Sequence, residues 1–310
     1  MSKSTMLNRR SALIGAATLP LAVSAATTTR ATSPMLGSTE AQFKRVVLGE
    51  FEVTTILAGS AVREEPQTIF GMNVDAEKFA AVTTAAKLPV NSVRFYFSPT
   101  VVNTGSELIL FDTGLQGPAT VAALAAAGYS PDQIDVVVIT HMHGDHIGGL
   151  ITDGNPTFPN AKYVTGSVEF DHWAKAENDN FEGRVRPLAE QFTMLKDGGS
   201  VASGITAMDT AGHTPGHMAY MLESAGQQLA ICADFANHYI WSLGYPDWEV
   251  RFDMDKAAAA TTRRRVLDML ATDKVPFVGY HMPFPAIGYV DKGTSEQAFH
   301  YVPHTYQLTL

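Results

Sequence analysis

The sequence has little cysteine, fewer basic than acidic residues, and no long apolar run. With one cysteine in 310 residues, no internal disulfide can form, so a packed apolar core must hold the fold. Lys and Arg number 22 against 31 Asp and Glu, a formal charge of −9, which argues against nucleic acid or an anionic membrane as the main partner. Outside the N-terminus, no segment approaches the roughly 20 strongly apolar residues of a membrane-spanning helix.

The N-terminus has the three-part layout of a secretory signal peptide. Its first ten residues are basic and contain no acid, 12–26 are mildly apolar and rich in Ala, and small residues at 23–25 or 29–31 offer a cleavage site. Arg9 and Arg10 stand directly before the apolar stretch. This pair favours the twin-arginine export route over an ordinary Sec signal.

These features predict the domain organisation and the location. We expect 1–31 to be a signal peptide, 32–44 a flexible arm and 45–310 one catalytic domain. Removing 1–31 removes four bases and no acid, so the net charge falls from −9 to −13. The mature protein is expected to be periplasmic or secreted, without membrane insertion and without nucleic acid as a partner.

The strand signals come first and are later mixed with helices. Segments 92–102 and 107–111 predict two strands joined by a turn at 103–105, and the β-branched run 135–140 predicts a fully buried strand. Further strands are expected at 205–209, 218–222, 229–233 and 277–280. This order favours an α/β fold, a mixed sheet sandwich covered by helices.

Three segments predict helices. Residues 118–127 open with Pro and end before Gly, and 167–177 begin at Ser167, a plausible N-cap. The third helix is expected at 255–271, with its run Arg263-Arg264-Arg265 forming a solvated face.

A dense group of ligand-type residues follows the buried strand. Residues 141–146 read His-Met-His-Gly-Asp-His, and imidazole and carboxylate groups are what zinc and similar divalent ions prefer. Backbone alternation places His141 and His143 on one side, and the next turn can direct Asp145 and His146 to a second point. The segment therefore predicts a metal site.

Two metal ions need further ligands, and three positions fit. His213 lies in the Gly/Pro-shaped turn Ala-Gly-His-Thr-Pro-Gly-His. Asp234 and His281 each end an apolar strand, an unusual place for an unpaired polar group. A bound metal explains all three.

This pattern resembles the metallo-β-lactamase superfamily across about residues 45–305. The matching features are HxHxDH, the GHTPGH turn, Asp234, His281 and the segment FDTG at 111–114. The segments VVNTGSELILFDTG and GYHMPFPAIGYV are closest in pattern to the methyl parathion hydrolase-like branch. The resemblance implies an αβ/βα four-layer sandwich with the metals at one edge of the two sheets.

The resemblance also implies the ligand sets. His141, His143 and His213 would hold one metal; Asp145, His146 and His281 would hold the other, with Asp234 bridging. Asp145 and Asp234 then have catalytic roles, because a hydroxide between the metals would be the nucleophile. The expected cofactors are two divalent ions, zinc first, with Mn²⁺, Co²⁺ or Fe²⁺ as alternatives.

Other polar residues are assigned supporting roles. Asp112 is expected to support the loop that carries the ligands, and His217 to be structural. His238 is a candidate proton donor to a leaving group. Cys232 is expected to be a buried, inert thiol.

Aromatic residues near the ligands are the candidate substrate contacts: Phe170, Trp173, Tyr239 and Trp241. Trp173 matches an aromatic of the leaving-group pocket in parathion-hydrolase-like relatives. Lactonase relatives often place Tyr three residues after the bridging Asp, where this chain has Asn237, which weakens a homoserine-lactone reading.

The leading hypothesis is an exported dinuclear-metal hydrolase of small apolar esters, phosphotriester-like compounds or lactones. Alternatives within the fold are a β-lactam hydrolase and an N-acyl homoserine lactone lactonase. Alternatives from other classes are an iron or sulfur redox relative and a catalytically silent metal-binding module. The redox reading is disfavoured because diiron relatives usually carry Glu where this chain has His143. A small-molecule substrate is the expected partner, and a homodimer is expected because relatives are often dimers.

Overall fold

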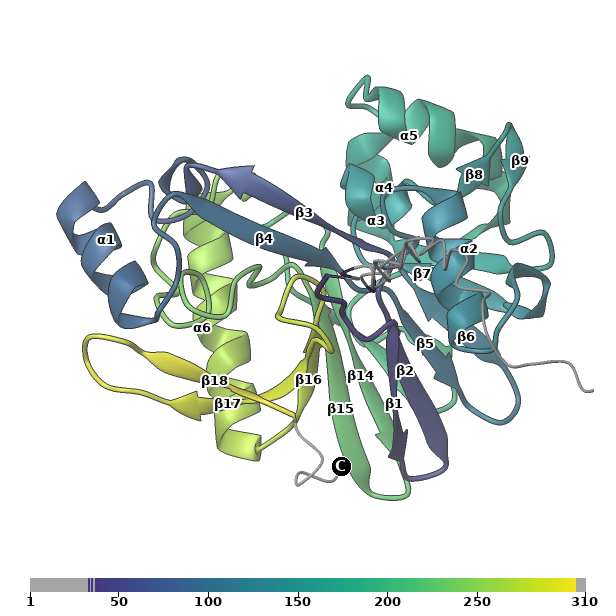
Figure 1. Cartoon of the computed structure of the whole chain (residues 1–310). Coiled ribbons are helices and arrows are strands. Elements are labelled where there is room, and N and C mark those ends of the chain that lie inside the picture. The colour runs from purple at the N-terminus through teal and green to yellow at the C-terminus, as the bar shows by residue number, and fades with distance from the viewer. Residues whose placement is uncertain (1–32, 34, 36, 305–310) are drawn as a thin grey trace, which may run out of the picture. The chain divides into compact units, whose positions relative to one another are not determined.

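The computed structural model describes residues 33, 35 and 37–304. The predicted signal peptide at 1–31 lies outside the described residues. The chain from Glu40 onward forms one compact unit, built around two seven-stranded mixed sheets that face each other (Figure 1). Its first strand begins at Phe43, two residues before the expected start of the catalytic domain.

The first sheet comes from the N-terminal half of the chain. Its strand order is β1-β2-β5-β6-β7-β10-β11, in which β6, β7, β10 and β11 run parallel. The bounds are β1 Phe43–Leu48, β2 Phe51–Ile56, β5 Thr100–Asn103, β6 Leu108–Phe111, β7 Val136–Ile139, β10 Lys162–Gly166 and β11 Phe192–Leu195.

The second sheet follows in sequence order, β12 to β18. Only β15 and β16 pair in parallel, and the other neighbours are antiparallel. The bounds are β12 Ser200–Ala202, β13 Ile205–Asp209, β14 Met218–Ser224, β15 Gln227–Ala233, β16 Phe277–Gly279, β17 Ile287–Lys292 and β18 Phe299–Pro303.

Two small ribbons and the helices complete the unit. The ribbons pair β3 Gly59–Glu64 with β4 Ser92–Phe97, and β8 Ile151–Thr152 with β9 Asn155–Pro156. The α-helices are α1 Ala76–Ala85, α2 Gly117–Ala126, α3 Gly144–Ile147, α4 Ser167–Trp173, α5 Asp179–Arg184 and α6 Lys256–Asp273. Short 3₁₀ helices occupy η1 Pro66–Thr68, η2 Pro131–Gln133 and η3 Arg186–Gln191.

Alternation along the central strands explains the layers. In β7, Val136 and Val138 pack into the core between the sheets, whereas Val137 and Ile139 pack against the cluster that includes α2 and the segment after α4. Both faces of this strand are buried, which is why 136–139 is continuously apolar. Helix α6 packs on the second sheet through Val266, Leu267 and Leu270. The result is the expected four-layer αβ/βα sandwich (Figure 1).

Most predicted elements are confirmed, with two differences in length. The hairpin at 103–105 and helix α2 form as expected. The predicted strand 92–102 is divided, because β4 pairs with β3 outside the main sheet and β5 resumes inside it. Pro99 separates the two parts, and proline has no N–H to continue a ladder. The predicted helix 167–177 ends earlier, at Trp173.

The prediction that Arg263 belongs to a solvated face is wrong. Helix α6 begins as expected, with the Asp255 side chain accepting a hydrogen bond from the N–H of Ala258. Arg263, however, is fully buried and paired with Asp253, while Arg264 pairs with the exposed Asp247.

Within the part of the chain that the structure describes, no helix is both long and apolar enough to span a membrane.

Candidate metal centre

The predicted ligands meet at one edge of the two sheets. His141, His143, Asp145 and His146 follow β7 in the first sheet. In the second sheet His213 follows β13, Asp234 follows β15 and His281 follows β16. Four strand ends therefore bring together residues that are up to 140 positions apart in the chain. Three overlapping groups of their ligand atoms, each atom within 4.8 Å of the others in its group, could hold metal ions.

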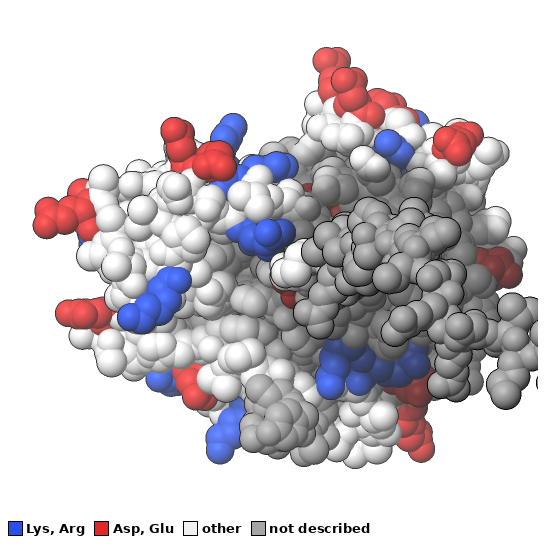
Figure 2. Space-filling model, in the orientation of Figure 1, with Lys and Arg blue, Asp and Glu red and all other residues white. Residues whose placement is uncertain are grey.

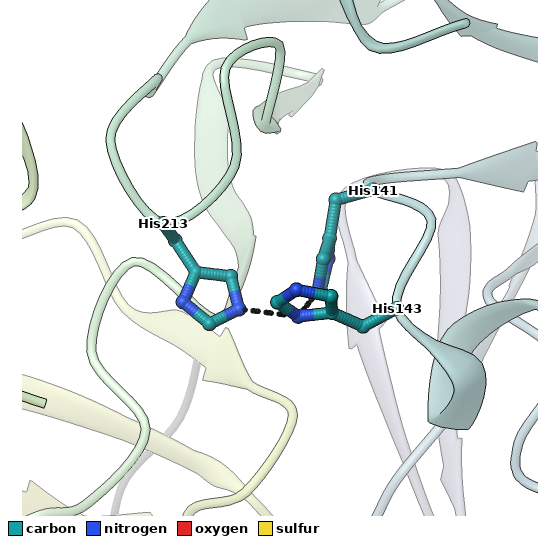
Figure 3. A group of neighbouring side chains, drawn as sticks. All are labelled: His141, His143 and His213. Atoms are coloured by element: carbon teal, nitrogen blue, oxygen red, sulfur yellow. Dashed lines mark hydrogen bonds between the residues drawn. The ribbon is translucent and has the colours of Figure 1, made fainter. Parts of the chain in front are cut away.

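The first group consists of three histidines (Figure 3). His143 Nδ1 lies 3.2 Å from His141 Nε2 and 3.0 Å from His213 Nε2. His141 and His213 are buried, and His143 is half-buried. Three imidazole nitrogens that converge this closely, without a carboxylate among them, form a set that suits zinc.

The second group consists of Asp145, His146 and His281, with Asp234 close to it. His281 Nε2 lies 3.3 Å from an oxygen of Asp145 and 3.1 Å from one of Asp234. Asp234 also lies 3.4 Å from His146 Nε2 and 3.5 Å from His213 Nε2. Asp234 is thus within reach of both groups, the place expected for a bridging carboxylate.

Local backbone irregularity directs Asp234 away from its strand. The pairing of β15 with β16 shifts register between Ile231 and Ala233, and Ala233 has a positive φ of 45°. Such a bulge bends a strand and changes the direction of the next side chain. His217 Nε2 accepts a hydrogen bond from the backbone N–H of Asp234 at 3.1 Å, which gives His217 the structural role expected of it.

Asp112 holds the loop after β7, as predicted. One of its oxygens lies 2.8 Å from His146 Nδ1, and the other accepts a hydrogen bond from the N–H of Thr140 at 2.9 Å. The Thr140 hydroxyl contacts both Asp112 and His141 Nδ1. Asp112 therefore directs His146 Nε2 towards the centre, an arrangement that is common around metal-binding histidines.

Asp253 is a supporting residue that the sequence reading missed. Its Oδ1 lies 2.9 Å from His213 Nδ1, and its Oδ2 accepts hydrogen bonds from both terminal nitrogens of Arg263. Both members of this ion pair are fully buried. The sequence offered no signal, because Asp253 stands 40 residues after His213 in an irregular segment.

A second missed residue, Glu169, joins the two ligand-bearing loops. It is fully buried, and its Oε1 accepts hydrogen bonds from the N–H of Met142 and the indole N–H of Trp173. Its Oε2 accepts from Thr214 and from the N–H of Gly216. A Cβ at Gly216 would lie 2.1 Å from the Glu169 nitrogen, so the second glycine of the GHTPGH turn permits this close approach.

The pKa values differ between the two groups. Burial and the neighbouring His213 lower the pKa of His143 to about 3, so its imidazole is neutral, the form that coordinates metals. Burial also opposes charge on His281, but Asp234 and Asp145 outweigh it and raise the pKa of His281 to about 10. The second group therefore favours positive charge at its centre.

The residues fit a metal centre. Among the described side chains, His146 Nε2 and Asp234 Oδ1 are buried and have no hydrogen-bond partner. A buried polar atom without a partner is costly, and here both atoms face other ligand groups. A cation between them would satisfy both.

A cavity of about 450 Å³ lies over these residues. Its apolar wall consists of Phe95, Phe97, Phe252 and Leu115, and its floor includes His143, Asp145, Asp234 and His281. Arg63, Asn180 and Arg184 complete the polar part of the lining. Volumes and linings of this kind are typical of small-molecule sites.

The four aromatic residues predicted to contact substrate are not among the described residues that line this cavity. Trp173 is buried beside His143, with ring centroids 5.9 Å apart, and Phe170 packs on Phe181; neither is among the described residues that line this cavity. Tyr239 and Trp241 line a second cavity, together with His238. These residues are close to Asp234 in sequence, but the loop after β15 carries them to the second cavity. Sequence proximity alone did not predict this path.

Asn237 does not occupy the place of a polar helper over the ligands. Its side chain is buried, and neither atom of its amide has a hydrogen-bond partner among the described residues. Asn237 is also absent from the described lining of the cavity.

Comparisons with known proteins agree with this geometry. The family model described as the Metallo-beta-lactamase superfamily matches residues 98–278, more than half of the chain. The N-acyl homoserine lactonase of Bacillus cereus is 24% identical over 162 residues, which are 52% of this chain and 61% of the lactonase. A probable metallo-hydrolase of Methanocaldococcus jannaschii is 35% identical over 96 residues, 31% of this chain and 36% of its own length. The matches thus span less than two thirds of these relatives.

Two solved structures share the fold over most of their length. One is AidC, a dizinc quorum-quenching lactonase in complex with the product N-hexanoyl-L-homoserine, with a TM-score of 0.77, 23% identity and coverage of 85% of this chain and 98% of that one. The other is AbOPH, a hydrolase in the beta lactamase superfamily, with a TM-score of 0.78, 23% identity and coverage of 87% and 99%.

Proposed function

The chain belongs to the metallo-beta-lactamase superfamily, and we propose that it is an exported hydrolase with two metal ions that cleaves small apolar esters, phosphotriester-like compounds or lactones. The observation that carries this proposal is the convergence of seven ligand-type side chains from four strand ends beneath one apolar-walled cavity. These residues would hold the metal ions that supply the nucleophile and electrophilic assistance, beside the space for a substrate.

The proposed ligands are those of the two groups. His141, His143 and His213 would hold one ion, Asp145, His146 and His281 the other, with Asp234 contributing to both. Two bound divalent ions, most simply zinc with Mn²⁺, Co²⁺ or Fe²⁺ as alternatives, would supply a water-derived nucleophile at neutral pH and would polarise the reacting carbonyl or phosphoryl oxygen.

The chain's own residues orient these groups and shape the substrate space. Asp112 and Asp253 fix the ring positions of His146 and His213 through their Nδ1 atoms. Phe95 and Phe97 exclude water from one side of the cavity, since both are largely buried and line it. Arg63 offers a donor to acceptor atoms of a bound substrate.

The proposed substrates follow from the cavity and the relatives. An apolar wall favours acyl or aryl groups, and lactonases occur among the curated relatives and the structural neighbours. Asn237 is buried away from the cavity lining, so lactone turnover here would proceed without a polar helper at that position. The pattern of the methyl parathion hydrolase-like branch supports aryl phosphotriesters as well.

Location and partners are proposed on the same basis. The basic N-terminus with Arg9 and Arg10 supports export by the twin-arginine route. On the face that Figure 2 shows, basic and acidic side chains both occur in separated groups, and the basic ones form no continuous patch. The net charge of −9 supports a small-molecule partner over nucleic acid. A homodimer is the proposed assembly.

A substrate panel tests the proposal. Protein loaded with zinc or manganese is assayed against aryl phosphotriesters, aryl esters, N-acyl homoserine lactones and nitrocefin. We expect turnover of at least one of the first three, and its loss in His143→Ala and Asp234→Ala. Turnover of nitrocefin alone would indicate a β-lactam hydrolase, and no turnover by fully loaded protein would refute the hydrolase.

A further inference from the structure

The β3–β4 ribbon separates two cavities. Side chains alternate across a strand, and here both strands send one set to each side. The set facing the cavity over the metal ligands is Ala61, Arg63, Phe95 and Phe97. The set facing a second cavity, of about 330 Å³, is Val62, Ser92, Arg94 and Tyr96. His281 lines both cavities.

The second cavity has apolar and aromatic walls and polar donors. The walls are formed by Leu88, Pro89, Tyr239, Trp241 and Pro283. The polar side chains that line it are Ser92, Arg94, Tyr96, His238 and His281. Among the described lining residues there is no carboxylate, although the protein as a whole is acidic. The lining is therefore suited to an apolar molecule with an acceptor or anionic head.

His238 is the central donor of this cavity. Its side chain is only 5% exposed and is stacked on Trp241, with ring centroids 4.0 Å apart. Its Nδ1 accepts hydrogen bonds from the backbone N–H groups of Ile240 and Trp241, both at 3.2 Å. Because Nδ1 is an acceptor, the neutral ring carries its proton on Nε2. No described residue accepts that proton.

Among the described residues of the lining, Arg94 is the one arginine, and no lysine is present. Arg94 is exposed, and one of its terminal nitrogens donates to the Ser60 hydroxyl at 3.1 Å, which leaves its other donors available. The carboxylate of Glu40 is outside the lining and accepts a hydrogen bond from the Tyr96 hydroxyl at 3.4 Å. The exposed guanidinium of Arg94 and the buried Nε2–H of His238 line the same cavity, and both are donors that an anionic head accepts from.

We infer that this second cavity binds a small apolar carboxylate, an acyl or aryl acid whose body lies against Tyr239 and Trp241 and whose head meets Arg94 and His238. Carboxylates of this class are what hydrolysis of esters or lactones releases. The link to product rests on the proposed function, whereas the binding itself does not.

The position of the cavity suggests a consequence for the metal centre. His281 Nδ1 donates to the backbone oxygen of Tyr96 at 2.7 Å, and both residues line the second cavity. An occupant would therefore contact the strand that orients a proposed metal ligand. A bound acid is expected to lower turnover without competing with substrate.

Isothermal titration calorimetry with octanoate tests the inference on the full chain as purified. Octan-1-ol, which has the same chain and no charge, is the matched probe. The variants are Arg94→Gln and His238→Asn, in which the Asn oxygen can still accept near the Nδ1 position. The control is Lys162→Gln, at an exposed position of β10 that is not among the described lining residues of either cavity.

We expect octanoate to bind one site per chain, more tightly than octan-1-ol. Loss of the buried donor in His238→Asn should weaken binding about tenfold, and loss of the exposed charge in Arg94→Gln about threefold. Lys162→Gln should bind as the wild type does. If His238→Asn does not fold, the octanoate affinity of Arg94→Gln, a change at an exposed position, tests the inference alone.

Three results would overturn the inference. These are no binding of octanoate, equal binding in Arg94→Gln and wild type, and equal affinity for octanoate and octan-1-ol. None of them bears on turnover of the substrate panel, so failure here is distinct from failure of the proposed function.

Discussion

Asp253 Oδ1 lies 2.9 Å from His213 Nδ1, and this contact links a proposed metal ligand to a fully buried ion pair with Arg263. The carboxylate fixes which nitrogen of His213 faces the other ligands. Helix α6, which carries Arg263, is thereby connected to the metal centre.

Asp253→Asn should weaken metal binding. The neutral amide is a poorer acceptor for His213 and leaves the buried charge of Arg263 less compensated. We expect metal affinity and kcat/KM to fall about 10- to 100-fold, the usual effect of losing such a supporting group. Metal content after dialysis and steady-state kinetics measure this. Asp247→Asn, at the exposed pair with Arg264, is the control, and equal behaviour of the two variants would contradict the role of Asp253.

Glu169→Gln should loosen both ligand-bearing loops. The Glu169 carboxylate accepts four hydrogen bonds in the buried interior. The side-chain amide of Gln would replace one acceptor oxygen with an NH₂ group, which would then face protein donors that it cannot accept from. We expect unfolding free energy to fall by about 2–4 kcal/mol, measured by urea denaturation. Asp171→Asn, two residues along the chain on an exposed position of the same helix, should change it little. Unchanged stability in Glu169→Gln would contradict the role of Glu169 in holding the two ligand-bearing loops together.

Phe252→Ala should affect substrate binding more than folding. Phe252 lines the cavity over the ligands and is 40% exposed, so its truncation removes contact area for substrate but little core packing. We expect KM to rise severalfold with the melting temperature nearly constant. Met254→Ala is the matched control, since Met254 is 48% exposed and is not among the described lining residues. Equal KM values in the two variants would place the substrate elsewhere.

The single thiol should be unreactive in the folded protein. Cys232 is fully buried in β15, and burial raises its pKa well above the ordinary value, so almost no thiolate forms. A disulfide reagent such as DTNB should modify none of it in native protein and one thiol per chain in guanidinium. Rapid modification of native protein would mean that β15 opens or is placed differently.

Much of the fold and of the ligand set was predictable from sequence. The run 135–140 has a strong apolar pattern because both of its faces are covered, and the ligands follow strand ends within short motifs. The structure brings His141, Asp234 and His281 together as these motifs predicted.

The residues that escaped prediction act through contacts that local sequence does not encode. Arg263 resembles its neighbours Arg264 and Arg265 in sequence, and only the packing of α6 on Asp253 distinguishes it. In sequence, Glu169 is one acidic residue of a predicted helix, and its role depends on the hydrogen bond from the N–H of Gly216, 47 residues later. Tyr239 and Trp241 follow Asp234 closely, but the loop turns them to the other side of the β3–β4 ribbon.

Zinc titration into chelator-treated protein, with hydrolysis of the best substrate followed at each addition, tests the central claim most directly. Seven ligand-type residues in two groups that share Asp234 predict that activity rises until two equivalents of zinc per chain are bound and then stays constant. Full activity at one equivalent, or no activity at any zinc content, would contradict the account.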